Sequence, residues 1–312
     1  MRQRWFIATA ALLGACGGAR VEAPPRADAP PGAHRPRSRA ESRTRAPDAS
    51  EPAADSGAPI EPDRTPAAPS CPPGMVHVRK DFCTEVERTC LKSSYDKPNH
   101  LTLCHEFKEE APRCVGSRVA LDFCIDEYEY PNQKGGHPPV MVSFYDASGL
   151  CAAEGKRLCY ESEWTAACEG PDEKPFPAGY ERSADICNID NRWIEPSLKK
   201  IYSSDRSVRE PELARLDQSV PSGAKPRCVS DYGVHDLTGN FDEWTLADHD
   251  RPRERAVFAA LKGGAWGHVR NACRPVTTSH SPDFTYYFVS LRCCADPAGA
   301  HGQGENPASK LP

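Results

Sequence analysis

The sequence predicts an irregular α+β domain with few short helices and strands, long loops and several disulfides. Helical signals are confined to two short segments, and the other apolar runs are brief and separated by turn residues. Fifteen cysteines supply the crosslinks, because cysteines pair in an oxidising compartment rather than persist as thiols. Disulfides at this density provide part of the stability that packed helices and sheets provide in other domains.

The two predicted helices are defined by their ends. Ser143 and Asp146 have the spacing of an N-terminal capping pair, and the helix that follows them stops at Gly155. A second short helix is predicted over residues 161–168 and is ended by Gly170 and the proline after it. The remaining sequence is expected to form short strands, turns and long loops.

Residues 1–16 have the pattern of a bacterial lipoprotein signal peptide. Two arginines precede an apolar run that is too short for a stable transmembrane anchor, and small residues follow it. The ending Leu-Gly-Ala-Cys-Gly resembles a lipobox, so lipidation of Cys16 is expected, with anchoring to the bacterial membrane on the periplasmic side or at the cell surface. The alternative is an ordinary cleaved signal in which Cys16 is incidental. Setting Cys16 aside leaves fourteen cysteines, an even number that permits up to seven disulfides.

Composition divides the rest of the chain into a tether, a domain and a tail. Residues 17–70 are rich in Ala, Pro, Arg, Asp and Glu and nearly lack branched apolar side chains, so a disordered tether is expected. Residues 71–298 are the predicted folded domain and are long enough for one hydrophobic core. Gly, Ala, Pro and Asn return in residues 299–312, which are expected to form a disordered tail.

Charge and cysteine spacing exclude several classes of function. The net charge is -5 and no run of Lys and Arg forms a basic stripe, so no nucleic-acid partner is expected. The sequence has no C-x-x-C pair, and the adjacent Cys293 and Cys294 do not replace one, so a zinc site is not expected. It also lacks a nucleophile elbow and a phosphate-binding glycine loop.

Four blocks of sequence carry a resemblance to one known family. They are residues 123–132, 139–164, 231–244, and 261–266 together with 281–293. In this order they resemble F-x-I-D-x-x-E-V-T-N, then P-V-x-x-V-S-W-x-D-A with A-G-K-R-L, then G-L-Y-D-M-x-G-N-V-W-E-W, and finally R-G-G-S-W with T-P-D to G-F-R-C. The chain therefore resembles the formylglycine-generating (sulfatase-modifying) enzyme family, which implies an irregular C-type-lectin-like fold.

The resemblance also implies two disulfides. The family joins the positions that match Cys151 and Cys293, and a structural pair matches Cys168 and Cys273. These bridges would close loops of roughly 140 and 105 residues, and each would stabilise the domain by about 4 to 5 kcal/mol in the chain-entropy model. The pairing of the other ten cysteines is left open.

Calcium is the cofactor that the resemblance makes possible. The family has one calcium site at an Asn-Ile pair, which matches Asn188 and Ile189 here, and another near the positions of Asn240 and Glu243. Amide, carboxylate and backbone oxygens are the hard ligands that calcium prefers. The acidic residue expected downstream of Asn188 is not identifiable in residues 190–200.

Copper is disfavoured, which leaves open whether the chain is an enzyme. The family oxidises a substrate cysteine with copper held by two cysteines shortly after the G-G-S-W block, since soft thiolates suit Cu(I). Counted from residues 263–264, His268 occupies the place of the first of them. Counted back from Pro282, Cys273 falls at the structural cysteine that pairs with the match of Cys168, and neither copper cysteine is left.

The sequence therefore predicts an exported, membrane-anchored lipoprotein whose domain is a non-catalytic binding or scaffold module. Its ligand is a protein or glycan that the sequence does not name. The alternative is a divergent metal-dependent oxidase in which His268 and Cys273, with His280 as a further candidate, form a changed site. Imidazole is a suitable ligand for copper and iron, which keeps that alternative open.

Overall fold

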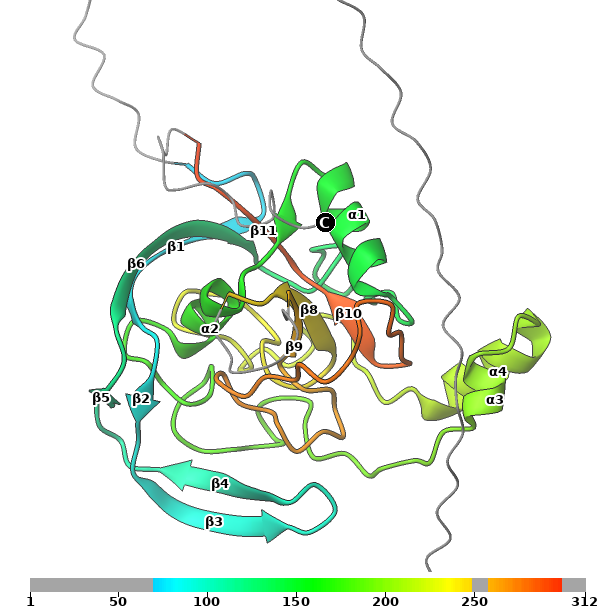
Figure 1. Cartoon of the computed structure of the whole chain (residues 1–312), viewed down its shortest axis with the longest axis horizontal. Coiled ribbons are helices and arrows are strands. Elements are labelled where there is room, and N and C mark those ends of the chain that lie inside the picture. The colour runs from blue at the N-terminus through cyan, green and yellow to red at the C-terminus, as the bar shows by residue number, and fades with distance from the viewer. Residues whose placement is uncertain (1–69, 249–257, 299–312) are drawn as a thin grey trace, which may run out of the picture. The chain divides into compact units, whose positions relative to one another are not determined.

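The computed structural model describes residues 70–248 and 258–298 (Figure 1). All of them belong to the second of two compact units of the chain, Glu61–Pro312. The predicted signal peptide with Cys16, nearly all of the predicted tether and the predicted tail lie outside the described residues. Within the described ranges, no helix has the length and apolar character needed to cross a membrane.

The elements follow one another as short strands first and mixed helices and strands afterwards. The first group is β1 (Met75–Cys83), β2 (Val86–Glu87), β3 (Cys90–Asp96), β4 (Leu101–Phe107), β5 (Arg113–Cys114) and β6 (Arg118–Asp126). The second is α1 (Phe144–Ala153), β7 (Arg157–Leu158), α2 (Glu161–Glu169), α3 (Leu198–Ile201), α4 (Arg206–Leu216), β8 (Asp242–Leu246), β9 (Ala259–Lys262), β10 (Val289–Leu291) and β11 (Cys293–Ala295). Both helices that the sequence predicts are present.

Helix α1 begins with the capping pair that the sequence indicates. The Asp146 backbone N–H donates to Ser143 Oγ at 3.1 Å, and the Asp146 carboxylate accepts from the Ser143 backbone N–H at 3.1 Å. Helices α3 and α4 were not predicted. Helix α4 contains Pro211, which argues against a helix when it is read from the sequence, although the Asp205 carboxylate caps its first turn at Ser207 N.

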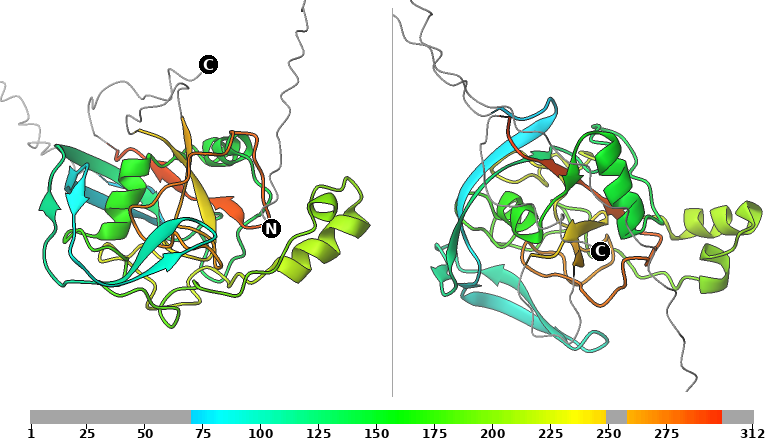
Figure 2. Two further views of the ribbon diagram at one scale, coloured as in Figure 1. Left: turned by 60° about the horizontal axis from the view of Figure 1, so that its bottom comes forward. Right: turned by 45° about the horizontal axis from the view of Figure 1, so that its top comes forward.

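The strands form one four-stranded sheet, one three-stranded sheet and two ribbons. The larger sheet has the order β1-β6-β11-β7, and the long β1–β6 ladder curves around α2 (Figures 1 and 2). The smaller sheet has the order β10-β8-β9, with β10 and β8 parallel. Strands β2 and β5 form one ribbon, and β3 and β4 form a hairpin at the bottom of the view in Figure 1.

The core consists of buried aromatic and aliphatic side chains on both sides of β8. Trp244 on β8 packs edge to face against Phe144 of α1, with ring centroids 5.9 Å apart. Trp164 of α2 is fully buried in a second cluster with Phe123 of β6. Large aromatic side chains bury much apolar area, which suits a domain with few regular elements.

Seven disulfides join all fourteen cysteines of the described residues. They are Cys71–Cys124, Cys83–Cys114, Cys90–Cys104, Cys151–Cys293, Cys159–Cys294, Cys168–Cys273 and Cys187–Cys228. Both pairs that the family resemblance implies are among them. The other five could not be read from the sequence, because many connectivities are compatible with one cysteine pattern.

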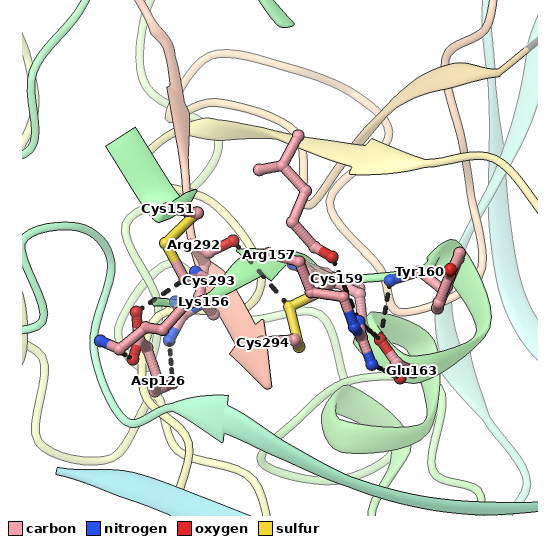
Figure 3. Close-up of a disulfide and its surroundings, with 12 residues drawn as sticks. Asp126, Cys151, Lys156, Arg157, Cys159, Tyr160, Glu163, Arg292, Cys293 and Cys294 are labelled. Atoms are coloured by element: carbon pink, nitrogen blue, oxygen red, sulfur yellow. Dashed lines mark hydrogen bonds and ion pairs between the residues drawn. A yellow bond between two sulfur atoms is a disulfide. The ribbon is translucent and has the colours of Figure 1, made fainter. Parts of the chain in front are cut away.

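Strand β11 is fixed by two adjacent bridges and by an ion pair (Figure 3). Cys293 is bonded to Cys151 of α1 and Cys294 to Cys159, so consecutive residues are tied to different segments. Beside them, Lys156 Nζ lies 2.8 Å from Asp126 Oδ1, a carboxylate that is fully buried. Strand β11 is therefore held between α1, β7 and β6.

Candidate functional site

The loop that follows β9 is held in place by one buried amide. Asn271 Nδ2 donates to the backbone carbonyls of Gly263, Gly264 and Ala265 at 3.3, 2.9 and 2.9 Å. Gly264 has a φ of +69°, and a Cβ there would lie 2.9 Å from Asn271 Nδ2, so this position requires glycine. The tight turn then presents His268 at the rim of a cavity.

His268 is oriented by a buried carboxylate. Its Nδ1 lies 3.1 Å from Oδ2 of Asp242, the first residue of β8, and its ring packs against Phe288 with centroids 4.7 Å apart. Burial lowers the pKa of His268, but the charge of Asp242 and its hydrogen bond outweigh burial and raise that pKa above its usual value. Engagement of Nδ1 leaves Nε2 as the nitrogen available to a ligand.

The cavity at His268 has a volume of about 480 Å³. The β3–β4 turn supplies one side through Asp96, Pro98 and Asn99, and the loop 267–270 supplies the other. Trp193 also lines it and is 48% exposed, which is unusual for so large an apolar side chain. The space is large enough for a small ligand or for one side chain of a partner.

The structure does not assemble His268, Cys273 and His280 into a metal site. The Cys273 sulfur is bonded to Cys168 and fully buried, so it has no thiolate to offer. His280 stacks on Phe284 with ring centroids 3.8 Å apart, and burial lowers its pKa. Across residues 70–248 and 258–298, no three His, Cys, Asp or Glu side chains converge as metal ligands.

The predicted calcium ligands are brought together only in part. Asn188 Nδ2 donates to Asn240 Oδ1 at 3.0 Å, and that oxygen also accepts from the Val220 backbone N–H at 2.9 Å. Ile189 is buried beside them. Glu243 is engaged elsewhere, since its carboxylate pairs with a guanidinium. The four residues as arranged do not fit a calcium ion, which needs six to eight free oxygen ligands.

The partner of Glu243 is Arg292, which the sequence analysis missed. Glu243 Oε1 lies 3.0 Å from Arg292 Nη2, and Glu243 Oε2 accepts from Trp164 Nε1 at 2.7 Å. Both charged side chains are almost completely buried. The available signal was a charged residue beside large apolar ones in each of two segments, Glu243 before a tryptophan and Arg292 between a leucine and a cysteine.

Two further buried carboxylates lie near this ion pair. Burial and the charges of Asp236 and Glu243 raise the pKa of Glu129 well above its ordinary value. Burial likewise raises the pKa of Asp236 to about 6. Glu129 accepts hydrogen bonds from Ser222 and Asn240, so the cluster is satisfied by polar neighbours. We regard it as structural, because none of its members lines the cavity at His268.

Comparison with known proteins places the chain in a family. Residues 110–297 match the model of the sulfatase-modifying factor enzyme 1-like domain, so the chain belongs to this family. Its few helices, many short strands and seven disulfides make it an α+β domain of the C-type-lectin-like, formylglycine-generating-enzyme kind.

Relatives of this family differ in what their names say about activity. The formylglycine-generating enzyme of Thermomonospora curvata is 28% identical over 184 residues, which cover 52% of this chain and 56% of that protein. The inactive C-alpha-formylglycine-generating enzyme 2 of Bos taurus is 27% identical over 177 residues, covering 54% of this chain and 52% of that protein. This chain thus spans about half the length of each.

Two solved structures match this chain over most of its length, with low identity and low TM-scores. PvdO from Pseudomonas aeruginosa has a TM-score of 0.41 and 15% identity, covering 73% of this chain and 100% of that one. Treponema denticola variable protein 1 has a TM-score of 0.43 and 11% identity, covering 71% of this chain and 99% of that one.

Proposed function

We propose that this protein is a non-catalytic binding module of the formylglycine-generating enzyme family, anchored to the cell envelope by a lipid on Cys16. The observation that carries the proposal is the Cys168–Cys273 disulfide. Only a deprotonated thiol binds Cu(I) or attacks a substrate, and the described residues contain no free cysteine. The ligand is a protein or a glycan at the bacterial surface or in the periplasm.

The alternative is a divergent metal-dependent oxidase, which the geometry at His268 favours. A histidine whose Nδ1 is fixed by a buried carboxylate has the orientation that metal-ligating and acid–base histidines use. Against it stands the loss of Cys273 as a ligand, since His268 alone would have to hold the metal. Positive charge on His268 at neutral pH, which Asp242 favours, would also oppose metal binding.

Copper loading separates these two functions. The protein is purified without a histidine tag, incubated with Cu(I) and passed through a desalting column, and its copper is measured by mass spectrometry. A binding module should retain no stoichiometric copper, and the His268→Ala variant should match the wild type. His137→Ala, at an exposed histidine that does not line the cavity, is the matched control. One equivalent of copper that is lost in His268→Ala, and kept in the control, would overturn the proposal in favour of the oxidase.

The lipid anchor has its own test. Cells that express the wild type should incorporate labelled fatty acid into the protein, because a cysteine follows the small residues at the end of the apolar run. The Cys16→Ser variant should carry no label. Equal labelling of the two proteins would contradict anchoring at Cys16 while leaving the binding function untouched.

A further inference from the structure

A second cavity, of about 630 Å³, lies between the β3–β4 hairpin and the body of the domain. Strand β4 forms one wall through residues 101–104 and Phe107, and the loop 269–276 forms much of the other. The region that matches the family model starts at residue 110. One wall of this cavity therefore comes from a part of the chain that the family model does not cover.

Strand β4 gives the cavity an apolar side. Its odd-numbered residues, which include Leu101 and Leu103, are half-buried, whereas Thr102 and Glu106 are exposed. Leu101, Leu103 and Phe107 all line the cavity. The ring of Phe107 packs edge to face on Phe176, with centroids 6.0 Å apart, so this side of β4 is turned toward the domain.

The other lining side chains make the cavity cationic. Four arginines line it and no Asp or Glu does: Arg88, Arg182, Arg270 and Arg274. Arg88 and Arg274 share the single carboxylate of Glu169, at 2.7 and 2.5 Å. Arg182 pairs with Asp190 at 2.6 Å. Four guanidinium groups thus face two neutralising carboxylates.

Arg270 carries most of the uncompensated charge. Its Nη1 donates to Thr277 Oγ1 at 2.8 Å, and it forms no ion pair with any described residue. Arg88 is also incompletely satisfied, because its Nε–H is buried and has no hydrogen-bond partner among the described residues. An anionic group in the cavity would supply the missing acceptor, and guanidinium–carboxylate pairs are among the strongest hydrogen-bonded contacts.

The edge of β4 beside the cavity is open. His105 O accepts from Arg182 N at 2.8 Å, and Phe107 N donates to Tyr180 O at 3.0 Å, so these two residues direct backbone groups away from β3. Leu101 and Leu103 lie farther along the same strand and line the cavity. The segment that pairs there ends at Arg182, and in the described ranges no other segment bonds to the backbone of either leucine.

We propose that this cavity binds an extended acidic segment of a partner protein, which adds as a strand to the open edge of β4. Backbone bonds to Leu101 and Leu103 would hold the segment, and an acidic side chain would pair with Arg270. An apolar side chain two residues away would lie on the same face of the segment, against the leucines. The inference deepens the proposed binding function by naming a class of partner.

The test uses capped pentapeptides and the full chain. Acetyl-Thr-Glu-Thr-Leu-Thr-amide presents Glu and Leu on one face, and the probe with Gln in place of Glu is its neutral match. Calorimetry should show saturable binding of the Glu probe, about tenfold or more tighter than that of the Gln probe, as a charged hydrogen bond provides. Arg270→Gln should abolish this preference. Arg206→Gln, at a 78% exposed arginine of α4, should leave it unchanged.

A second variant tests strand addition separately from charge. No described segment outside the β3–β4 ladder bonds to the Leu103 backbone, so Leu103→Pro, which removes the donor that an added strand would use, should abolish binding. Hydrogen exchange in β3 should match the wild type, which shows that the hairpin stays folded. Leu103→Val should bind as the wild type does. Three results would each overturn the proposal. They are equal binding of the Glu and Gln probes, undiminished binding of the Glu probe to Leu103→Pro, and an affinity for N-acetylglutamate amide equal to that for the Glu probe. None of these results depends on copper, so this inference and the proposed function can fail separately.

Discussion

Six of the seven disulfides fall into two groups that differ in sequence separation, and the seventh, Cys187–Cys228, spans 41 positions. In the region matched by the family, three buried bridges join residues 142, 135 and 105 positions apart. The three bridges of the N-terminal strands span 53, 31 and 14 positions, and the shortest, Cys90–Cys104, lies in the exposed hairpin. The first group determines the topology of the core, whereas the second fixes local geometry at its edge.

The difference in loop length indicates that the core bridges and the hairpin bridge have different roles. Loop closure restricts the unfolded chain more when the loop is long, so the core bridges account for more of the stability. A short bridge within a hairpin adds little to the core but holds β4 beside the arginines of the loop 269–276. The core thus provides stability, and the hairpin provides a positioned surface.

Removal of a long-range bridge should have the largest effect. The double variant Cys168→Ser, Cys273→Ser should lose about 4 to 5 kcal/mol of unfolding free energy, because the bridge closes a loop of roughly 105 residues. Guanidinium titration followed by tryptophan fluorescence would measure the loss. A loss of less than about 1 kcal/mol would show that the long bridges are not what stabilises the core.

The buried ion pair of the core should rank next. Arg292→Met leaves the Glu243 carboxylate buried without its cation, which should cost about 3 to 5 kcal/mol. The double variant Arg292→Met, Glu243→Leu removes both charges and should recover part of that loss in the same titration. If the double variant is less stable than the single one, the ion pair makes a net favourable contribution to stability. It would then do more than offset the cost of burying its two charges.

Loss of the hairpin bridge should have a smaller and more local effect. Cys90→Ser, Cys104→Ser opens a loop of 14 residues, for which the chain-entropy model sets an upper limit of about 3 kcal/mol. Hydrogen exchange should speed up in β3 and β4 and stay unchanged in β6 and β8. Faster exchange throughout the core would contradict the separation of the two regions.

What could be predicted from the sequence follows the same division. The helix cap at Ser143 and the family blocks depend on local spacing, and the resemblance supplied the Cys168–Cys273 pair. The cationic cavity could not be predicted, because Arg88 and Arg270 are 182 positions apart and meet only through the fold. The Glu243–Arg292 pair was missed for the same reason, since each charge is satisfied by a residue far away in the sequence.

The smallest effect concerns the two histidines near the first cavity. Asp242 raises the pKa of His268 despite burial, whereas burial lowers the pKa of His280. Titration by NMR should therefore find the midpoint of His268 above 6.5 and that of His280 below it. Asp242→Asn should move the His268 midpoint downward and leave His280 on the same side of 6.5.

The raised pKa of His268 also fixes the sign of its effect on stability. The folded protein holds this proton more tightly than the unfolded chain, so the contribution is fully present below the unfolded pKa of about 6.5 and is lost as pH rises through the folded pKa. The unfolding free energy of wild type relative to His268→Gln should thus fall as pH rises above about 6.5. A difference that grows as pH rises would mean that His268 is neutral in the fold, the protonation state that a metal ligand needs.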